Sequence, residues 1–500
     1  MKQKSFLSNA LILTAGSVLA KVFSAVYRIG LTRILGGVGI GIYQLVFPVY
    51  SLCVVLATAG LPMAISKVVA RNKHCAKSVL KKCFISTSLM SLALTFLLCV
   101  FSRGIADVQG NAQLTICYLL LAPTIIIISV SSVLRGYFQG VNDFNPSSIS
   151  NIVEQFVKLV VGLVLSLILI RVSLFAAIVG AVGSIIVSEI LGVVVLVVFI
   201  KKRRLATAKC QVTFKEIYKD ILPITATNLI LPIASFVDSL VVVNLLSFNF
   251  ANPVSTFLYG LESGAVSSLV SLPTIFSFAV ASVILPNITN ENNQMNKNKK
   301  FSLAIKLVLI ICIPCVVAFV TIPNELIELL YGGRLNDFAI NGARIASRLL
   351  AISSFGVLFL ALSQIYSSCL QAVNERYVAV RNLLIGVGAK FFLELIFMPS
   401  LSVNIYALAV ANTACYLVVM ALNHFEVREN FSFSIDFIFA GKLILANVVM
   451  VLTLVAVLAI SKHVTIVMLA IILAILVYFS TLIITKIFNK KDVAFWKYKL

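Results

Sequence analysis

The sequence contains few charged residues. Asp, Glu, Lys and Arg make up 12% of its 500 residues, whereas hydrophobic residues make up 60%. A soluble domain carries about 25% charged residues. A soluble protein could not keep this much apolar surface away from water, but the lipid tails of a bilayer solvate apolar side chains. The composition therefore excludes a soluble globular protein and indicates an integral membrane protein.

Motifs of enzymatic chemistry are also lacking. There is no Walker A motif, so this chain does not itself supply ATP hydrolysis. The three histidines, His74, His424 and His463, lie near predicted loops and do not cluster. Cys312 and Cys315 form a C-x-x-C pair inside an apolar segment, but no second pair or nearby histidine completes a zinc set. Packing as small hydrophobic residues explains them better. We therefore predict no enzyme, no metal site and no bound cofactor.

Long apolar runs set the number of helices. A spanning helix needs about 20 mostly apolar residues, and about 35 residues per pass allow about fourteen passes in this chain. The charge-free runs, such as 84–101 and 112–134, are too long for the strands of a barrel. We predict an all-α integral membrane fold of about fourteen transmembrane helices. The predicted spans are 8–34, 40–68, 80–102, 112–139, 147–170, 173–200, 217–246, 255–288, 301–322, 343–373, 378–399, 403–424, 437–460 and 463–487.

The net charge of +22 is distributed unevenly between the two sides of these helices. If the amino terminus is cytoplasmic, 28 of the 40 Lys and Arg residues fall on the cytoplasmic side. Lys and Arg accumulate in cytoplasmic loops, so both termini are predicted to face the cytoplasm of a bacterium. The positive charge then reflects topology and attraction to the anionic headgroups of membrane lipids, not nucleic-acid binding. Four basic residues lie on the opposite side: Arg103, Arg171, Arg334 and Lys462.

An internal repeat links the two halves of the chain. Residues 139–143 (QGVND) and 371–375 (QAVNE) are separated by 232 positions, and the same offset relates Lys158 to Lys390. Two halves with an even number of helices are parallel repeats, which enclose a midplane cavity and alternate access by rocking. We predict an N-terminal six-helix lobe (1–204), a C-terminal six-helix lobe (205–430), two additional transmembrane helices (431–488) and a cytoplasmic tail (489–500).

Ionisable residues inside a membrane are costly, and they usually face a cavity or a charged partner. Lys21 and Arg28 are seven positions apart and share one face of their helix, with Tyr27 beside it. Two cations on one inward face need a counter-charge. A bound substrate diphosphate could supply it, since arginine grips phosphate in a bidentate manner. The alternative is a structural ion pair with Asp238 or Glu262.

Other charged residues in the spans extend the candidate site. Glu154 and Lys158 are four positions apart, as are Lys390 and Glu394, so each pair could neutralise itself along its helix. The predicted substrate-binding residues in the cavity are Lys21, Tyr27, Arg28, Arg33, Glu154, Lys158, Arg348 and Lys390. Asp238 and Glu262 are the predicted coupling-ion or counter-ion residues, because a carboxylate in a helix interior can exchange a proton or hold sodium.

Three blocks of this sequence resemble a known family. The first block includes Tyr27-Arg28-Ile29 and Gly39-Ile40-Gly41-Ile42-Tyr43-Gln44, the second is 58–67, and the third is Arg135-Gly136-Tyr137-Phe138-Gln139-Gly140. They resemble the stage V sporulation protein B group, in the polysaccharide-exporter branch of the multidrug/oligosaccharidyl-lipid/polysaccharide superfamily. The resemblance implies two six-helix lobes plus two helices. It also implies flipping of undecaprenyl-linked cell-wall precursors, such as lipid II, to the outer leaflet.

The sequence is similar, more distantly, to lipid II flippases, whose first helix has cavity arginines and an Arg-Asp pair. Here Lys21 matches the first basic position, and Tyr27-Arg28 stands where Arg-Asp would be. The resemblance implies a lipid-linked oligosaccharide substrate, a role in cell-wall or spore assembly, and cell-wall synthesis proteins as partners. Two alternatives stay open, a multidrug antiporter for organic cations and a non-transporting scaffold. The driving force could be the membrane potential, protons or sodium ions.

Overall fold

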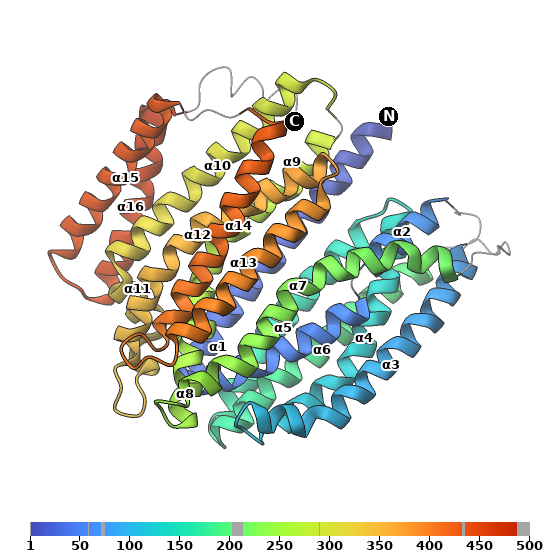
Figure 1. Ribbon diagram of the computed structural model, residues 1–500, viewed down its shortest axis with the longest axis horizontal. Helices are drawn as coiled ribbons and strands as arrows, with labels where there is room; N and C mark the ends of the chain where they lie inside the picture. The colour runs from blue at the N-terminus through green and yellow to red at the C-terminus, as the bar shows by residue number, and fades with distance from the viewer. Residues whose placement is uncertain are drawn as a thin grey trace. The chain divides into compact units, whose positions relative to one another are not determined.

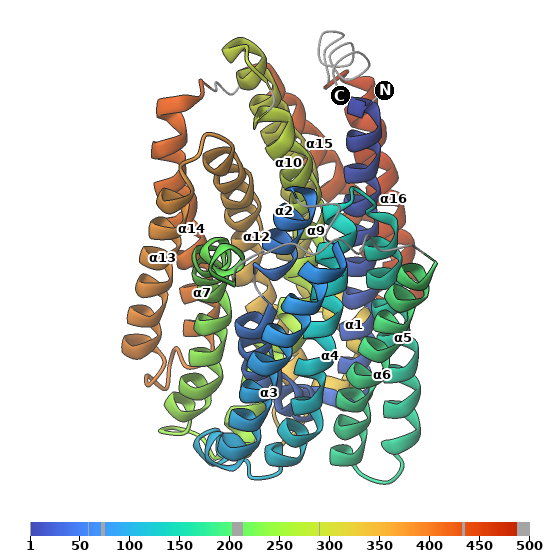
Figure 2. The same ribbon diagram turned by 90° about the vertical axis from the view of Figure 1, so that its right-hand side faces the viewer.

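The computed structural model describes residues 2–58, 60–71, 76–202, 214–289, 291–432 and 436–487. Within these ranges the chain is helical, with no β-strand beyond an isolated bridge between Asp337 and Ile340 (Figures 1 and 2). This confirms the all-α prediction. Residues 203–213, between the sixth and seventh predicted spans, and the predicted cytoplasmic tail (489–500) lie outside the described residues.

The helices follow one another with short connections. In chain order they are α1 (Lys2–Thr58), α2 (Leu61–Arg71), α3 (Ala76–Val108), α4 (Leu114–Gly140), α5 (Asn145–Leu169), α6 (Leu174–Lys201), α7 (Phe214–Leu246), α8 (Asn252–Gly260), the π-helical turn η2 (Leu261–Val266), α9 (Ser267–Thr289), α10 (Gln294–Thr321), α11 (Pro323–Tyr331), the 3₁₀ turn η3 (Gly332–Leu335), α12 (Gly342–Ala372), α13 (Arg376–Phe397), α14 (Tyr406–Asn430), α15 (Phe437–Leu458) and α16 (Val464–Ile484).

Twelve helices in the described part of the chain are long and apolar enough to cross a membrane. The first of them, Ala15–Ala70, covers the first two predicted spans. The predicted span 378–399 corresponds to α13, which is not among the twelve because it carries Arg381, Lys390 and Glu394. Each of the predicted spans therefore has a helix in its place, and the fold is that of a multi-pass membrane protein.

The chain forms two compact units. The first comprises Met1–Ala265 with Met398–Ser402, and the second comprises Val266–Phe397 with Val403–Leu500. In the first unit α5 packs beside α6, and in the second α15 packs beside α16 (Figures 1 and 2). The predicted lobe boundaries at 204 and 430 stay a prediction, because compactness alone does not define a repeat.

The glycine-rich stretch 36–41, between the first two predicted spans, belongs to α1. Only Gly36 leaves the helical conformation, with φ 68° and ψ −172°, a region that favours glycine. A Cβ atom on Gly41 would lie 2.2 Å from the carbonyl oxygen of Thr256, and one on Gly260 would lie 2.6 Å from the Gly41 nitrogen. Beyond the break, these glycines therefore serve the close packing of α1 on α8.

The repeated QGVND and QAVNE segments form the same helix end. Asn142 and Asn374 have positive φ angles of 60° and 69°. The Asp143 N–H donates to the Phe138 carbonyl oxygen at 2.9 Å, and Glu375 N–H donates to Leu370 at 2.8 Å. Both are Schellman caps, in which a left-handed residue ends the helix. The repeat found in the sequence is thus also a structural repeat.

Polar contacts between helices follow the same repeat. In the first unit, Arg135 of α4 donates to Ser150 of α5 at 3.2 Å, and the Ser150 hydroxyl lies 3.1 Å from a backbone carbonyl oxygen of α6. The positions 232 residues later are Ser367 of α12 and Asn382 of α13. Asn423 of α14 joins these two, with hydrogen bonds of 2.9 Å to each. Asn382 also accepts from Arg381 at 3.2 Å, so an arginine takes part in both networks.

The cap at Asn374 leads to a first prediction. Its side chain is exposed, so its main contribution is tolerance of the left-handed conformation. We expect Asn374→Ala to lower the free energy of unfolding by about 1 kcal/mol, because a Cβ without a polar group disfavours this region. Thermal unfolding of the purified variants measures this, and Asn374→Gly should be as stable as the unsubstituted protein. An equal loss of stability in both variants would show that side-chain contacts of Asn374, not its φ angle, determine its contribution to stability.

The polar stretch before the ninth predicted span is ordered by its own contacts. We predicted a helix from 301, but α10 begins at Gln294, capped by the Asn293 side chain, which accepts from the Met295 N–H at 2.9 Å. Lys300 lies 3.1 Å from the Glu291 carboxylate. The hydrogen bond from Lys300 lowers the pKa of Glu291 to about 2. The carboxylate therefore favours the folded state above its ordinary pKa, and this contribution is lost as the pH falls toward about 2.

Candidate functional site

A cluster of cations and aromatic rings lies inside the first unit. The Arg28 guanidinium carbon is 5.9 Å from the centroid of the Phe47 ring. Lys158 Nζ lies 4.9 Å from the same centroid and 5.3 Å from that of Tyr27. A cation within about 6 Å of a ring is attracted to the ring's quadrupole. Two cations from α1 and α5 thus share one phenylalanine.

The break at Gly36 makes this cluster possible. Arg28 and Phe47 are 19 positions apart in α1. In a straight helix that separation would be about 28 Å. The two arms of α1 must therefore fold back on each other at the glycine, which brings the second arm beside the first. The glycine can be identified in the sequence, but the reversal of the helix direction cannot.

Tyr27 is held tightly beside these cations. It is buried, and its hydroxyl donates to the Ala181 carbonyl oxygen of α6 at 3.4 Å. A Cβ atom on Gly162 would lie 2.6 Å from the Tyr27 ring, so α5 needs glycine there. The ring therefore has a fixed position between α1, α5 and α6, and it presents one face to Lys158.

Glu154 lies one helical turn before Lys158 but is bound elsewhere. It is 3% exposed and forms an ion pair with Arg135 of α4. The Ser150 hydroxyl lies 3.0 Å from Glu154 Oε1. The pairing of Glu154 with Lys158 that the spacing suggested is thus replaced by a pairing between helices. Among the residues that the structure describes, Arg28 and Lys158 form no ion pair.

The other predicted residues of the first unit lie at different depths. Lys21 on α1 and Asp238 on α7 are half-buried, and Arg33 on α1 is exposed. Glu262 is buried and lies within the π-helical turn η2. Short π-helical segments occur often at functional sites. The coupling-ion roles of Asp238 and Glu262 stay predictions.

In the second unit, the lysine that repeats Lys158 is paired locally. Lys390 Nζ lies 3.6 Å from Glu394 Oε1 on the next turn of α13, and both side chains are buried. The local pairing suggested by the sequence is therefore present here. Arg348 on α12 is exposed.

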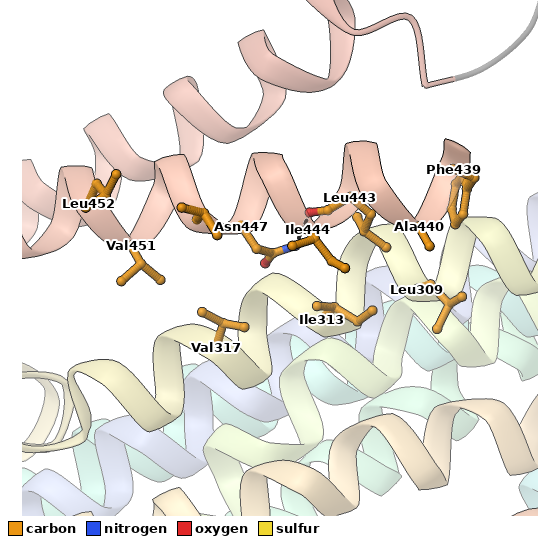
Figure 3. A pocket seen from close by; sticks show the side chains of 11 residues that line it. Leu309, Ile313, Val317, Phe439, Ala440, Leu443, Ile444, Asn447, Val451 and Leu452 are labelled. Carbon is orange, nitrogen blue, oxygen red and sulfur yellow. Dashed lines mark hydrogen bonds between the residues drawn. The ribbon is translucent and has the colours of Figure 1, made fainter. Parts of the chain in front are cut away.

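An apolar groove of about 590 Å³ lies between α10 and α15 in the second unit (Figure 3). Asn447 is the polar residue among those that line it, and its amide nitrogen donates to the Leu443 carbonyl oxygen at 2.8 Å. The sequence predicted both helices but not that this face stays uncovered. The lining residues are Leu309, Ile313, Val317, Phe439, Ala440, Leu443, Ile444, Asn447, Val448, Val451 and Leu452.

Sequence reasoning missed two residues of the cluster. Arg135 was noted only as part of a family block, although the rule for ionisable residues in spans would have singled it out. Phe47 carries no signal of its own, because a phenylalanine in a membrane span is usually there for packing. Its role depends on the cations that the fold brings to its ring.

Helices of spanning length in two compact units, with half-buried cations among them, are the features of a multi-pass membrane protein of the transporter class. The chain belongs to the polysaccharide biosynthesis protein family, whose model matches residues 6–291. It is 26% identical over 456 residues to stage V sporulation protein B of Bacillus subtilis (strain 168), covering 87% of this chain and 86% of the relative. It is 22% identical over 427 residues to the lipid II flippase MurJ of the same strain, covering 78% and 76%.

Solved structures share this fold. The lipid II flippase MurJ in an inward closed conformation matches with a TM-score of 0.71 at 18% identity, over 94% of this chain and 97% of that one. An inward-facing multidrug resistance MATE family transporter of the MOP superfamily matches with a TM-score of 0.67 at 15% identity, over 84% and 97%. These neighbours are transporters, in agreement with the prediction of a protein that is not an enzyme. The family resemblance inferred from the sequence is confirmed.

Proposed function

We propose that the chain is a flippase for an undecaprenyl-diphosphate-linked cell-wall precursor, lipid II-like or carrying another oligosaccharide. The precursor would cross the cytoplasmic membrane by alternating access. The observation that carries the proposal is the pair of cations at Phe47. Arg28 and Lys158 both lie within 6 Å of the Phe47 ring centroid, yet neither forms an ion pair among the described residues. Like charges in a membrane interior are costly unless an anion compensates them.

A diphosphate is the anion that suits this arrangement. Arginine can donate two parallel hydrogen bonds to phosphate oxygens, and lysine adds a mobile point charge. The rings of Tyr27 and Phe47 keep both cations in position without neutralising them. An organic cation would be repelled by the same pair. The cluster thus favours a lipid-linked anionic headgroup over the substrate of a multidrug antiporter.

The remaining predicted residues enter the proposal in supporting roles. Lys21, Arg33, Arg348 and Lys390 would contact the headgroup or guide it to the cavity. Asp238 and Glu262 would couple transport to protons or sodium ions, unless the membrane potential drives it alone. The groove between α10 and α15 offers the apolar surface that a polyprenyl chain needs. The charge distribution supports cytoplasmic termini, and cell-wall synthesis proteins would be partners.

The proposal is tested by complementation in a bacterium depleted of its own lipid II flippase. We expect the unsubstituted protein to restore growth and to relieve the accumulation of lipid II on the cytoplasmic side. A matched strain that expresses an unrelated membrane protein at the same level is the control. If the protein does not restore growth but confers resistance to organic cations, the antiporter is favoured. If it does neither, despite normal insertion, another lipid-linked glycan or a scaffold is favoured.

A further inference from the structure

The two repeated lysines differ in what their neighbouring carboxylate does. Lys390 is 3.6 Å from Glu394, one turn further along α13. Lys158, at the equivalent position of the first unit, has Glu154 one turn before it on α5. Glu154 is bound to Arg135 of α4 instead. One lysine is therefore neutralised by its own helix, and the other is not.

Three helices restrain the Glu154 carboxylate. Arg135 comes from α4, and the Ser150 hydroxyl, one turn earlier on α5, lies 3.0 Å from Oε1. On α6 a Cβ atom at Gly192 would lie 2.0 Å from the same oxygen, so only glycine leaves room for the carboxylate. The Ser150 hydroxyl also lies 3.1 Å from the Gly192 carbonyl oxygen and accepts from Arg135 at 3.2 Å. The carboxylate therefore occupies a built site formed by α4, α5 and α6.

Without this restraint, Glu154 would pair with Lys158. Glutamate four positions before lysine on a helix is the favourable orientation for an ion pair. The attraction is stronger where water is excluded, because the effective dielectric constant is lower. The pair Lys390–Glu394 shows that the same helix position can support a local pair even in the reverse order.

We propose that Arg135 is a positioning residue, which sequesters the Glu154 carboxylate so that Lys158 keeps its charge for the phosphate of the substrate. This inference rests on the proposed function of Lys158 as a phosphate-binding residue. Arg135 and Ser150 then influence the affinity for the anion without contacting the substrate themselves. It also explains why the two repeated lysines have opposite surroundings.

A second carboxylate provides the matched control. Glu189 of α6 interacts electrostatically with Arg135, Glu154 and Lys158. It forms no ion pair with them among the described residues, so Arg135 does not hold it in the way it holds Glu154. If Arg135 acted only by balancing negative charge, neutralising either glutamate would compensate equally for its loss. If Arg135 sequesters one carboxylate, only neutralising Glu154 compensates.

The experiment measures equilibrium binding of farnesyl diphosphate to the purified full-length protein in lipid nanodiscs. We expect Arg135→Gln to weaken binding about tenfold, the loss expected when one charge-assisted contact to phosphate is removed. Arg135→Gln/Glu154→Gln should return to within about threefold of the unsubstituted protein. Arg135→Gln/Glu189→Gln should stay as weak as the single variant. Arg135→Lys, which retains a cation for Glu154, should bind normally and controls for folding.

Several outcomes would overturn the inference. Equal recovery by both double variants would reduce Arg135 to general charge balance, and no recovery by Glu154→Gln would make it a structural or substrate-contacting residue. Lys158→Gln separates this inference from the proposed function. If Lys158→Gln weakens binding while Arg135→Gln does not, the sequestration fails and the phosphate site stands. If Lys158→Gln binds normally, the phosphate site itself fails.

Discussion

Replacing Gly260 by alanine is expected to prevent folded protein from accumulating in the membrane. The added Cβ would lie 2.5 Å from the Gly37 carbonyl oxygen, 2.6 Å from the Gly41 nitrogen and 2.7 Å from the Gly41 Cα atom. All three are backbone atoms, which cannot turn aside as a flexible side chain can. Relief would require α1 and α8 to separate, at a cost of about 3 kcal/mol or more.

The separation would also break a contact that flanks Glu262. Gln44 of α1 donates to the Ser263 carbonyl oxygen in η2 at 2.9 Å. Losing this hydrogen bond would leave the buried Gln44 amide without this acceptor, which costs about 1–3 kcal/mol more. The same substitution would therefore disturb the turn that holds the buried Glu262, even in whatever fraction of protein still inserts.

Gly104→Ala is the matched control for this prediction. Gly104 lies in α3, and an added Cβ there meets nothing within 4 Å. Alanine is favoured over glycine in a helix interior by about 1 kcal/mol, so this variant should be as stable as the unsubstituted protein or more so. Membrane levels and thermal unfolding of the purified variants give the comparison. Normal levels and an unchanged melting temperature for Gly260→Ala would contradict the close packing.

Neutralising both cations at Phe47 is expected to abolish rescue of a flippase-depleted strain. A hydrogen bond to a charged group contributes about 1.5–3 kcal/mol, so Arg28→Gln or Lys158→Gln alone should weaken binding of a prenyl diphosphate about 10- to 100-fold. The double variant should lose both contributions. Since neither cation forms an ion pair among the described residues, neutralisation breaks no direct charge pair. The variants should therefore fold normally.

Two comparisons make the result specific. Arg171→Gln removes the same charge from an exposed position in the turn between α5 and α6, and it should leave rescue unchanged. Lys390→Gln, by contrast, would strand the buried Glu394, so a loss of stability of about 3–5 kcal/mol is expected. Full rescue by the Arg28→Gln/Lys158→Gln variant at matched membrane levels would remove the cluster from the substrate site. Loss of rescue by Arg171→Gln as well would indicate a general effect of charge.

The helices could be predicted from the sequence because lipid leaves the backbone few alternatives. Inside a bilayer every N–H and C=O must be satisfied within the segment, so an apolar run of spanning length forms a helix. Segment ends were predicted less well, as α10 shows. Its first turn is made of polar residues, and the cap at Asn293 and the contact between Glu291 and Lys300 hold it. A hydropathy pattern does not include such contacts.

The repeat was also present in the sequence, because a helix end is a local structure. Asn142 and Asn374 take the left-handed conformation in caps with the same hydrogen bonds. Asparagine tolerates that conformation better than most residues, and the bonds that close the cap join positions only a few residues apart. A local structure of this kind can therefore be predicted from five aligned residues.

The partners of the charged residues were decided by the tertiary structure alone. Spacing along a helix predicted two lysine–glutamate pairs, and it was right for Lys390 with Glu394 and wrong for Glu154 with Lys158. Periodicity shows which residues share a face, but it does not show which side chain of another helix reaches that face. Arg135, on the neighbouring helix, forms an ion pair with Glu154. The change of direction at Gly36 brings the Phe47 ring close to Arg28. The sequence thus determined that cations lie within the membrane, whereas packing between helices determined which of them keep their charge.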